Sequence, residues 1–384
     1  MFWKYFSFEA KLLIKSKKMW LVSFLLILFF PIYFMIYSQA DTYSLYHEKY
    51  AEGDMMNSIF NYIQEDLEEN NEELHRNLLE QNSIINFQKY YLGAGSDHEA
   101  YVESMPELIE LRLEVHEIGY DEIPDHLIVP REEVEKDDAI ISYIDNNNIP
   151  LQAEGVTTNS YMIAAFTFLS GIYFYFIVLL SSSDSLIYER HHRTVMNGFP
   201  ISFMKKILSK VTLHFLFIFT SLTIGALIGL FYSSKQTEFG HFMYPVLFYS
   251  NGEFHAIATW EYLLLIIVAY VVITIFTLLL TLLLNLILKN AYATILVALG
   301  ILLIPTLMTQ VGIESPLQLF IQFIDITSVM SGELEITTNL NYTHAITWLT
   351  IGSIILTFAI YIVHKLNYIN FNWSSQQERS ARSD

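Results

Sequence analysis

The chain has 384 residues, of which 53% are hydrophobic, and its formal net charge is −19. A mean hydropathy of +0.36 excludes an ordinary soluble domain and indicates that much of the chain lies in a membrane. The absence of cysteine excludes disulfides, thiol catalysis and cysteine-based zinc or iron–sulfur sites.

Six apolar runs are long enough to cross a membrane, since a helix needs roughly 20 mostly apolar residues to span ~30 Å of hydrocarbon. The predicted spans are residues 19–37, 161–180, 211–232, 263–288, 291–308 and 346–364. The first run is longer than the roughly 7–15-residue apolar core of a signal peptide, so we expect an anchor that is not cleaved. The predicted fold is therefore an all-α polytopic membrane protein with six transmembrane helices.

The positive charges lie on one side of the predicted spans. With residue 1 inside, the inside segments hold 14 of the 21 Lys and Arg residues, and the outside segments hold 35 of the 40 Asp and Glu residues. This positive-inside pattern predicts that both termini are cytoplasmic. A large outside segment without disulfides is typical of a bacterial envelope protein, so we expect the bacterial plasma membrane.

Residues 1–18 mix aromatic and apolar side chains with lysines. This composition is typical of a helix that lies in the membrane interface, with its lysines toward anionic lipid. The helix is also a candidate contact for a cytosolic partner. The residues that mark it most clearly are Trp3, Lys4, Lys11 and Lys15.

Residues 38–160 form a predicted outside domain. Residues 41–160 hold 28 acidic and six basic side chains, whereas the rest of the chain has a net charge of +3. Such acidity is typical of a solvated surface, and it also suits the attraction of cationic substrates. Apolar spacing over residues 59–78 predicts an amphipathic helix, and strict alternation over residues 109–115 predicts a strand. We therefore expect an α+β domain.

Three His-Glu pairs occur in this domain, beginning at His47, His98 and His116. None is followed by the second His that the helical zinc-protease motif requires. Scattered surface histidines are the better interpretation, and we expect no catalytic site and no metal site in the chain.

Residues 181–210 form a short basic segment between the second and third predicted spans, with a Gly-Phe-Pro break at residues 198–200. The basic charge has two interpretations. It orients the neighbouring spans in the membrane, or it forms a surface on which a cytoplasmic partner docks.

Few polar groups interrupt the predicted spans. His214 and Asn285 are candidates for a substrate path or for hydrogen bonds between packed helices. Gly225 and Gly229 have the small-xxx-small spacing that lets two helix backbones approach closely, although glycine is common in spans.

Pro305 is expected to kink or end the fifth span. Residues 309–345 are apolar but too interrupted for a seventh span, so we expect a re-entrant or interfacial hairpin on the outside. Residues 365–384 form a predicted cytoplasmic tail.

The chain has no G-x-x-x-x-G-K-[ST] motif, and its inside segments are too short for a nucleotide-binding domain. If the protein uses ATP, the ATPase is a separate chain.

The segment YERHHRTVMNGFPISFMKKILSKV (residues 188–211) resembles the cytoplasmic signature of ABC-2 type transporter permeases. The match consists of Glu189-Arg190, Thr194, Pro200-Ile201-Ser202 and Lys210, and the sequence departs from the pattern at His191 and Arg193. The order of one span, an outside domain and five further spans is similar to the sodium, drug and peptide export branch. The stretch His126–Val134 also resembles the Ile-Pro strand end of its outside domains.

The resemblance implies a half-transporter of the type V exporter kind, in which two permease subunits pair and two cytoplasmic ATPase chains dock beneath them. ATP and Mg would be bound by the partner ATPase, with no cofactor in this chain. The second permease subunit would be an identical or a different chain, and no nucleic-acid partner is expected. The implied ATPase-coupling residues are Glu189, Arg190, His191, His192, Arg193, Thr194, Gly198 and Pro200.

The favoured function is therefore that of a permease subunit of an ATP-driven exporter for a hydrophobic or amphipathic cargo, such as an antimicrobial peptide, a drug or a lipid. The alternative is a sensor or mechanotransmitter, in which the outside domain binds a ligand or a partner and nothing crosses the membrane. A membrane enzyme is the third interpretation, and the residue spacing does not favour it.

Overall fold

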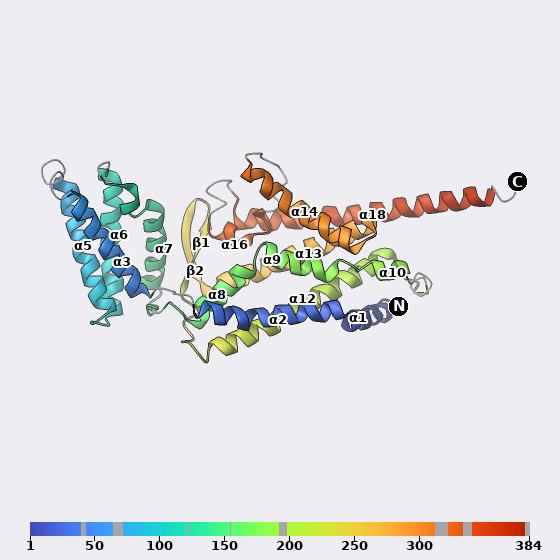
Figure 1. The fold of residues 1–384 in the computed structure, drawn as a ribbon, viewed down its shortest axis with the longest axis horizontal. Helices are drawn as coiled ribbons and strands as arrows, with labels where there is room; N and C mark the ends of the chain where they lie inside the picture. The colour runs from blue at the N-terminus through green and yellow to red at the C-terminus, as the bar shows by residue number, and fades with distance from the viewer. Residues whose placement is uncertain are drawn as a thin grey trace.

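The computed structural model describes residues 1–39, 44–63, 72–120, 123–153, 155–191, 198–311, 322–332 and 340–380. Figure 1 shows an elongated, mostly helical molecule, with a short helical bundle at one end and a longer body of helices beside it. Both chain termini lie at the end of the body that is far from the bundle. We call this the inner end and the end near the bundle the outer end.

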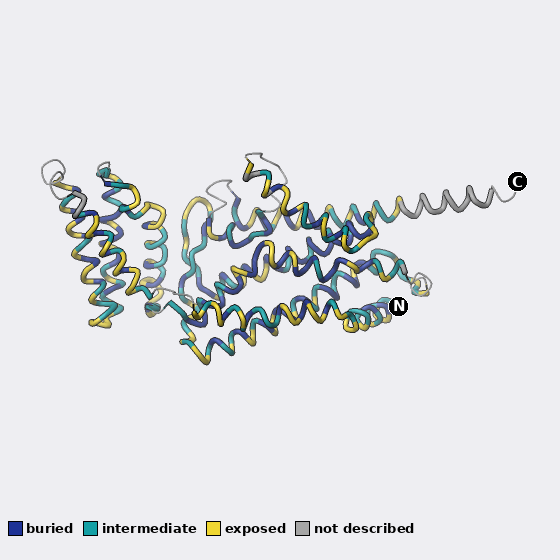
Figure 2. The backbone as a smooth tube through the Cα atoms, viewed as in Figure 1, coloured by how far each residue is buried: buried dark blue, intermediate teal, exposed yellow. Residues whose placement is uncertain are grey.

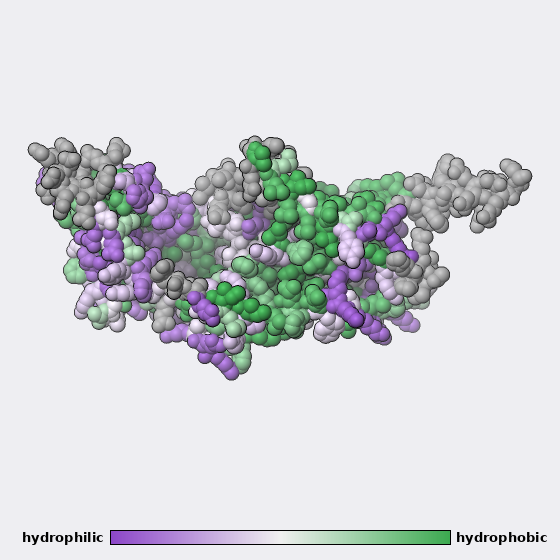
Figure 3. Space-filling model, viewed as in Figure 1, coloured by the Kyte–Doolittle hydropathy of each residue, from purple (hydrophilic) through white to green (hydrophobic). Residues whose placement is uncertain are grey.

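The body is built from long apolar helices joined by short ones. In chain order they are α1 (Phe2–Lys15), α2 (Lys17–Tyr37), α8 (Thr158–Leu169), α9 (Ile172–Ser182), α10 (Ile187–His191), α12 (Phe203–Ser233), α13 (Thr259–Leu288), α14 (Ala291–Gln310), α16 (Ile326–Met330) and α18 (Tyr342–Ser380). Many of their large apolar side chains are exposed, as expected for helices whose outer faces contact lipid rather than water. Figure 3 shows hydrophobic residues gathered along this body and hydrophilic ones toward both ends.

Among the described residues, four helices are long and apolar enough to cross a membrane, namely α2, α12, α13 and residues Tyr342–Leu366 of α18. The pair α8 and α9 makes a fifth candidate span, which is bent by 61° at the break between its two helices. The prediction of a multi-pass membrane protein is confirmed at the level of four to five candidate spans.

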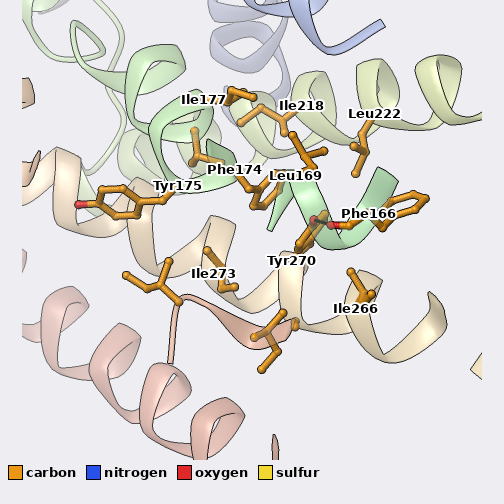
Figure 4. Close-up of a cluster of buried hydrophobic side chains, with 14 of the residues drawn as sticks. Phe166, Leu169, Phe174, Tyr175, Ile177, Ile218, Leu222, Ile266, Tyr270 and Ile273 are labelled. Carbon is orange, nitrogen blue, oxygen red and sulfur yellow. Dashed lines mark hydrogen bonds between the residues drawn. The ribbon is translucent and has the colours of Figure 1, made fainter. Parts of the chain in front are cut away.

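The buried core of the body lies where these helices meet, as Figure 2 shows. Aromatic side chains fill much of it. Phe174 stacks on Tyr270 with ring centroids 4.0 Å apart, and Phe166 lies beside the same tyrosine (Figure 4). The bent span α8–α9 and the straight helix α13 are therefore packed together at the centre of the body.

Helices α2 and α12 approach closely at Gly225 and Gly229. A Cβ atom on Gly225 would lie 2.7 Å from the carbonyl oxygen of Leu26, and one on Gly229 would lie 2.8 Å from the Cβ of Phe30. Any larger residue would push the two backbones apart, so the glycine pair sets the spacing of these two spans.

A β-hairpin joins α12 to α13 at the outer end. Strands β1 (Pro245–Ser250) and β2 (Glu253–Ala258) are antiparallel, with Ser250 opposite Glu253. The two turn residues, Asn251 and Gly252, have φ angles of 58° and 89°. This Asn-Gly turn matches the right-handed twist of the strands, which explains why the hairpin forms at this point.

The bundle consists of α3 (Leu45–Ile63), α5 (Glu72–Leu92), α6 (His98–Ile118), the 3₁₀ turn η1 (Asp125–Leu127) and α7 (Arg131–Asn146), around an apolar core of its own. Helix α7 packs on both strands of the hairpin, which attaches the bundle to the outer end of the body. The bundle lies between α2 and α8 in the chain, in the position of the predicted outside domain.

The predicted α+β character of this domain is wrong for its described residues, which form helices. The predicted strand over residues 109–115 lies inside α6. The alternating run also satisfies helical spacing, because Leu108, Leu111, Arg112 and Val115 are the residues that α6 buries on one face. The strand end expected within His126–Val134 is likewise the turn η1 followed by the start of α7. The helix predicted over residues 59–78 is represented by the end of α3 and the start of α5, and residues 64–71 between them lie outside the described part.

A buried charge network crosses the bundle core. Arg112 pairs with Glu52 at 2.8 Å and with Asp137 at 3.3 Å, and Lys49 pairs with Glu52 at 2.9 Å. Burial alone would raise the pKa of Glu52, but Lys49 and Arg112 more than offset it, so this pKa lies below its ordinary value. At Asp137 burial outweighs the same two cations, and its pKa is raised. The network therefore depends on Glu52 more than on Asp137.

The fifth predicted span corresponds to α14, whose apolar stretch Ala291–Pro305 is shorter than the other candidate spans. Pro305 lies inside α14 rather than at its end. Helix α14 starts from the inner end of α13, whereas α16 contacts β1 at the outer side. The chain therefore travels outward between α13 and α16, and a sixth crossing by α14 remains a prediction. Of the predicted hairpin at residues 309–345, residues 312–321 and 333–339 lie outside the described part.

Candidate functional site

A buried polar cluster joins three helices at the inner end of the body. Tyr5 and Glu9 lie one turn apart on α1, Glu189 lies on α10, and Lys210 lies in the second turn of α12. We call these four residues the junction cluster. Figure 1 shows α1 and α10 together at the end where both chain termini lie.

The four side chains share a small number of polar atoms. The Tyr5 hydroxyl lies 2.6 Å from Oε1 of Glu9 and 2.7 Å from Oε1 of Glu189. Nζ of Lys210 lies 2.9 Å from the same Glu9 oxygen and 3.3 Å from the same Glu189 oxygen. Since a hydroxyl has one proton, Tyr5 donates to one carboxylate at a time, and Lys210 is the cation that both carboxylates share.

Burial makes these contacts strong. Tyr5 is fully buried and Lys210 is only 4% exposed, so water does not replace a lost partner. Burial, together with the charges of Glu189 and Glu9, raises the pKa of the Tyr5 hydroxyl well above its ordinary value. Tyr5 therefore remains a protonated donor, and the junction cluster carries one negative charge that is buried between α1, α10 and α12.

The Gly-Phe-Pro break packs against the same region of α1. The Phe199 ring lies 5.5 Å from the Tyr5 ring in an edge-to-face arrangement and 5.3 Å from the Phe8 ring. Gly198 and Pro200, on either side, are exposed. Phe199 therefore anchors the end of the basic segment on α1, and its neighbours remain accessible at the inner surface.

The Arg190 side chain contacts the inner end of α13 instead of extending into solvent. Its guanidinium donates to the carbonyl oxygens of Asn285 at 2.8 Å and of Leu286 at 3.2 Å. The last carbonyls of a helix lack intrahelical donors and carry partial negative charge. Arg190 therefore caps α13, and the Glu189-Arg190 pair contacts three helices of the body, namely α1, α12 and α13.

The root of the basic segment is a turn at Ser182–Ser185, just after α9, and three spans contact it. Lys18 of α2 forms an ion pair with Asp184. His214 of α12 lies 3.1 Å from the Ser185 hydroxyl, and the Asn285 side chain donates to the carbonyl of Ser182 at 3.5 Å. The structure therefore places His214 and Asn285 against this turn, where they make helix-packing contacts.

The remaining predicted residues are distributed as follows. Trp3, Lys4, Lys11 and Lys15 are exposed on α1, on the face opposite the buried Tyr5 and Glu9. His192, Arg193 and Thr194 lie outside the described residues, and of His191 only the backbone is described. Among the described residues, no group of three or more His, Asp or Glu side chains has the arrangement of a metal site.

Sequence reasoning missed the junction cluster as a unit. The available signal was Glu9, which is the only acidic residue among the five lysines of residues 1–18, with a tyrosine one turn before it. A lone carboxylate in a basic interfacial helix predicts a specific cationic partner, and here that partner is Lys210.

Comparison with protein-family models, with curated proteins and with solved structures gives no match. The class that the structure itself defines is a mostly helical membrane protein with four to five candidate spans, one short β-hairpin and a helical bundle between its first two span positions.

Proposed function

We propose that the chain is the membrane-spanning permease subunit of an ATP-driven exporter, which moves a hydrophobic or amphipathic cargo outward and is powered by a separate cytoplasmic ATPase. The observation that carries the proposal is the attachment of the basic segment. Its residues bind α1, α12 and α13 through Glu189, Phe199 and Arg190, and its root binds α2. A partner that moved this segment would move four helices of the body together.

The charge distribution supports the orientation that this function needs. The exposed lysines of α1 and the basic segment share the inner end, whereas the acidic bundle lies at the outer end. By the positive-inside rule the inner end is cytoplasmic, where an ATPase has access to it. The bundle is then extracellular, and Gly198 and Pro200 face the cytoplasm.

Single-cysteine variants provide the test, because the natural chain has no cysteine. We expect Gly198→Cys to react with a membrane-impermeant maleimide only from the cytoplasmic side of oriented vesicles, and Asp145→Cys in α7 to react only from the outside. Both positions are exposed, so they form a matched pair. The opposite labelling would refute the orientation.

The same two cysteine variants test whether a cytoplasmic ATPase binds the chain. When the chain is co-expressed with the ATPase that its own genome encodes beside it, a bifunctional cross-linker on Gly198→Cys should capture that ATPase. The yield should change when ATP and vanadate are added, and Asp145→Cys should give no product. A Gly198→Cys variant that is cytoplasmic yet captures no nucleotide-binding chain would rule out the coupling role.

A sensor or mechanotransmitter is the second candidate function, and the packing of α7 on β1 and β2 favours it. A ligand that displaced the bundle would act directly on the hairpin between α12 and α13. The two functions differ in cargo movement. Nucleotide-dependent loss of a fluorescent lipid or peptide from vesicles supports the exporter, and signalling without any such movement supports the sensor.

A further inference from the structure

The bent span is interrupted at Ser170 and Gly171. Gly171 has a φ of 66° and a ψ of −131°, a backbone conformation that other residues rarely adopt. Helix α8 has 12 residues and α9 has 11, so the break lies about 16–18 Å from either end of the pair. The freed backbone groups therefore lie inside the candidate span rather than at either end of it.

A carboxylate approaches the break from another part of the chain. A Cβ atom on Gly171 would lie 3.3 Å from Cγ and from Oδ1 of Asp325, the residue that precedes α16. Asp325 accepts hydrogen bonds from Thr327 at 3.1 Å and from Ser328 at 3.0 Å. Within the described part of the chain, no Lys, Arg or His forms an ion pair with it. A buried charge among membrane helices without a cationic partner is costly, which makes Asp325 a candidate functional residue.

Oxygen atoms converge on the same point. The carbonyl oxygens of Phe166 and Thr167, in the last turn of α8, both accept from the Ser170 amide at 3.1 Å, and the Tyr270 hydroxyl donates to Phe166 at 2.7 Å (dashed in Figure 4). Tyr270 is near enough to Asp325 to interact with its charge and lies beside the Ser170 side chain. The C-terminal end of α8 adds partial negative charge to that of Asp325.

Two buried oxygen atoms make no hydrogen bond of standard geometry with the described residues. One is the Oγ of Ser170, a residue that is 5% exposed and that has the Tyr270 side chain beside it. The other is Oε1 of Gln322, which lies one turn before Asp325. An amide oxygen can only accept hydrogen bonds or bind a cation. Leaving a buried polar atom without a hydrogen bond destabilises the fold, so such atoms are uncommon. Within the described part of the chain, the Ser170 Oγ is therefore a buried oxygen at the break that is available to bind a cation.

We propose that this break binds one monovalent metal cation, held by the Asp325 carboxylate, the Ser170 hydroxyl and carbonyl oxygens at the end of α8. All of these ligands are oxygen, which selects a hard cation, and a single carboxylate balances a single charge. Broken spans, in which the carbonyl oxygens at the end of a half-helix accept a further ligand, are suited to such ions. The bound cation holds α8, α9 and α16 together. The proposal does not rest on the exporter function, since a sensor would carry the same site.

The test is the thermal unfolding of the purified full-length chain in detergent, with sodium chloride as the probe and choline chloride keeping the ionic strength constant. We expect a saturable rise of the midpoint temperature with sodium. Asp325→Asn should abolish the rise, and Asp145→Asn, an exposed acid in the bundle, should leave it unchanged. Ser170→Ala should require about tenfold more sodium, the change that a loss of ~1.4 kcal/mol of binding free energy produces.

Ser170→Ala keeps the test decisive if Asp325→Asn does not fold, because it removes a single hydroxyl and leaves the carboxylate and its hydrogen bonds in place. The same sodium response in wild type and Ser170→Ala would overturn the proposed ligand set. A rise that choline reproduces, or a sodium response that persists in Asp325→Asn, would overturn the cation site. A midpoint that varies with pH but not with sodium would show a proton site instead and would also overturn it.

Discussion

Replacing Lys210 by methionine should destabilise the inner end of the body more than any other single substitution of a lysine on α12. Nζ of Lys210 is 2.9 Å from Glu9 and 3.3 Å from Glu189, and both carboxylates are largely buried, with 10% and 15% of their side chains exposed. Without the lysine they retain only the single Tyr5 proton between them. Breaking a buried ion pair by removing one partner costs roughly 3–5 kcal/mol, and we expect a loss in that range.

The assay is reversible unfolding in mixed micelles with increasing dodecyl sulfate. Lys205→Met is the matched control, since Lys205 is an exposed lysine of the same helix outside the junction cluster, and its loss should cost less than about 0.5 kcal/mol. Adding Glu9→Gln to Lys210→Met should recover part of the stability, because it removes one of the two unpaired charges. If the double variant is no more stable than Lys210→Met, the shared-lysine account of the cluster is refuted.

Three further substitutions test other contacts. Glu52→Gln should lower the stability of the bundle by about 3 kcal/mol at neutral pH, and Asp137→Asn should lower it much less. Because folding lowers the pKa of Glu52, the stability that Glu52 contributes is present above pH 4.5 and is lost as the pH falls through the lowered pKa. Urea unfolding at several pH values measures this loss. Arg190→Ala should speed amide exchange at the inner end of α13, where two carbonyl groups lose a charged donor worth about 1.5–3 kcal/mol. Gly225→Ala should cost about 1–3 kcal/mol in the same micelle assay, whereas Gly300→Ala, whose Cβ would meet nothing nearer than 3.6 Å, should be tolerated.

The spans were predictable because a long apolar run has few alternatives in a chain that is more than half hydrophobic. The break in the second span was not, since Ser170 and Gly171 are small residues that hydropathy tolerates inside a run. The importance of the break is visible only in the contact between Gly171 and Asp325, which are more than 150 residues apart in the sequence. The periodicity of apolar residues carries no information about such a contact.

The wrong strand prediction over residues 109–115 and the hairpin that was not predicted both have local causes. In α6, alternation over seven residues fits both a strand and one face of a helix, and the packing of neighbouring helices decided between them. The hairpin carried its own signal in Asn251-Gly252, the strongest short-range mark of a tight turn between strands, and that signal was in the sequence from the start.

The residues of the candidate site could be predicted from the sequence only in part. Glu189 and Arg190 were identified from the resemblance, but their partners were not, because Tyr5 and Lys210 are brought to them only by the packing of α1 and α12. Short-range patterns identify which residues are unusual, and the tertiary structure determines what each one contacts.

The junction of β2 with α13 has a mechanical consequence. Strand β2 ends at Ala258 and α13 begins at Thr259, so no flexible linker separates the hairpin under the bundle from a helix of 30 residues, about 45 Å long. That helix contains neither proline nor glycine, and Arg190 holds its far end. We therefore expect a tilt of the bundle to move α13 as one stiff rod along its whole length.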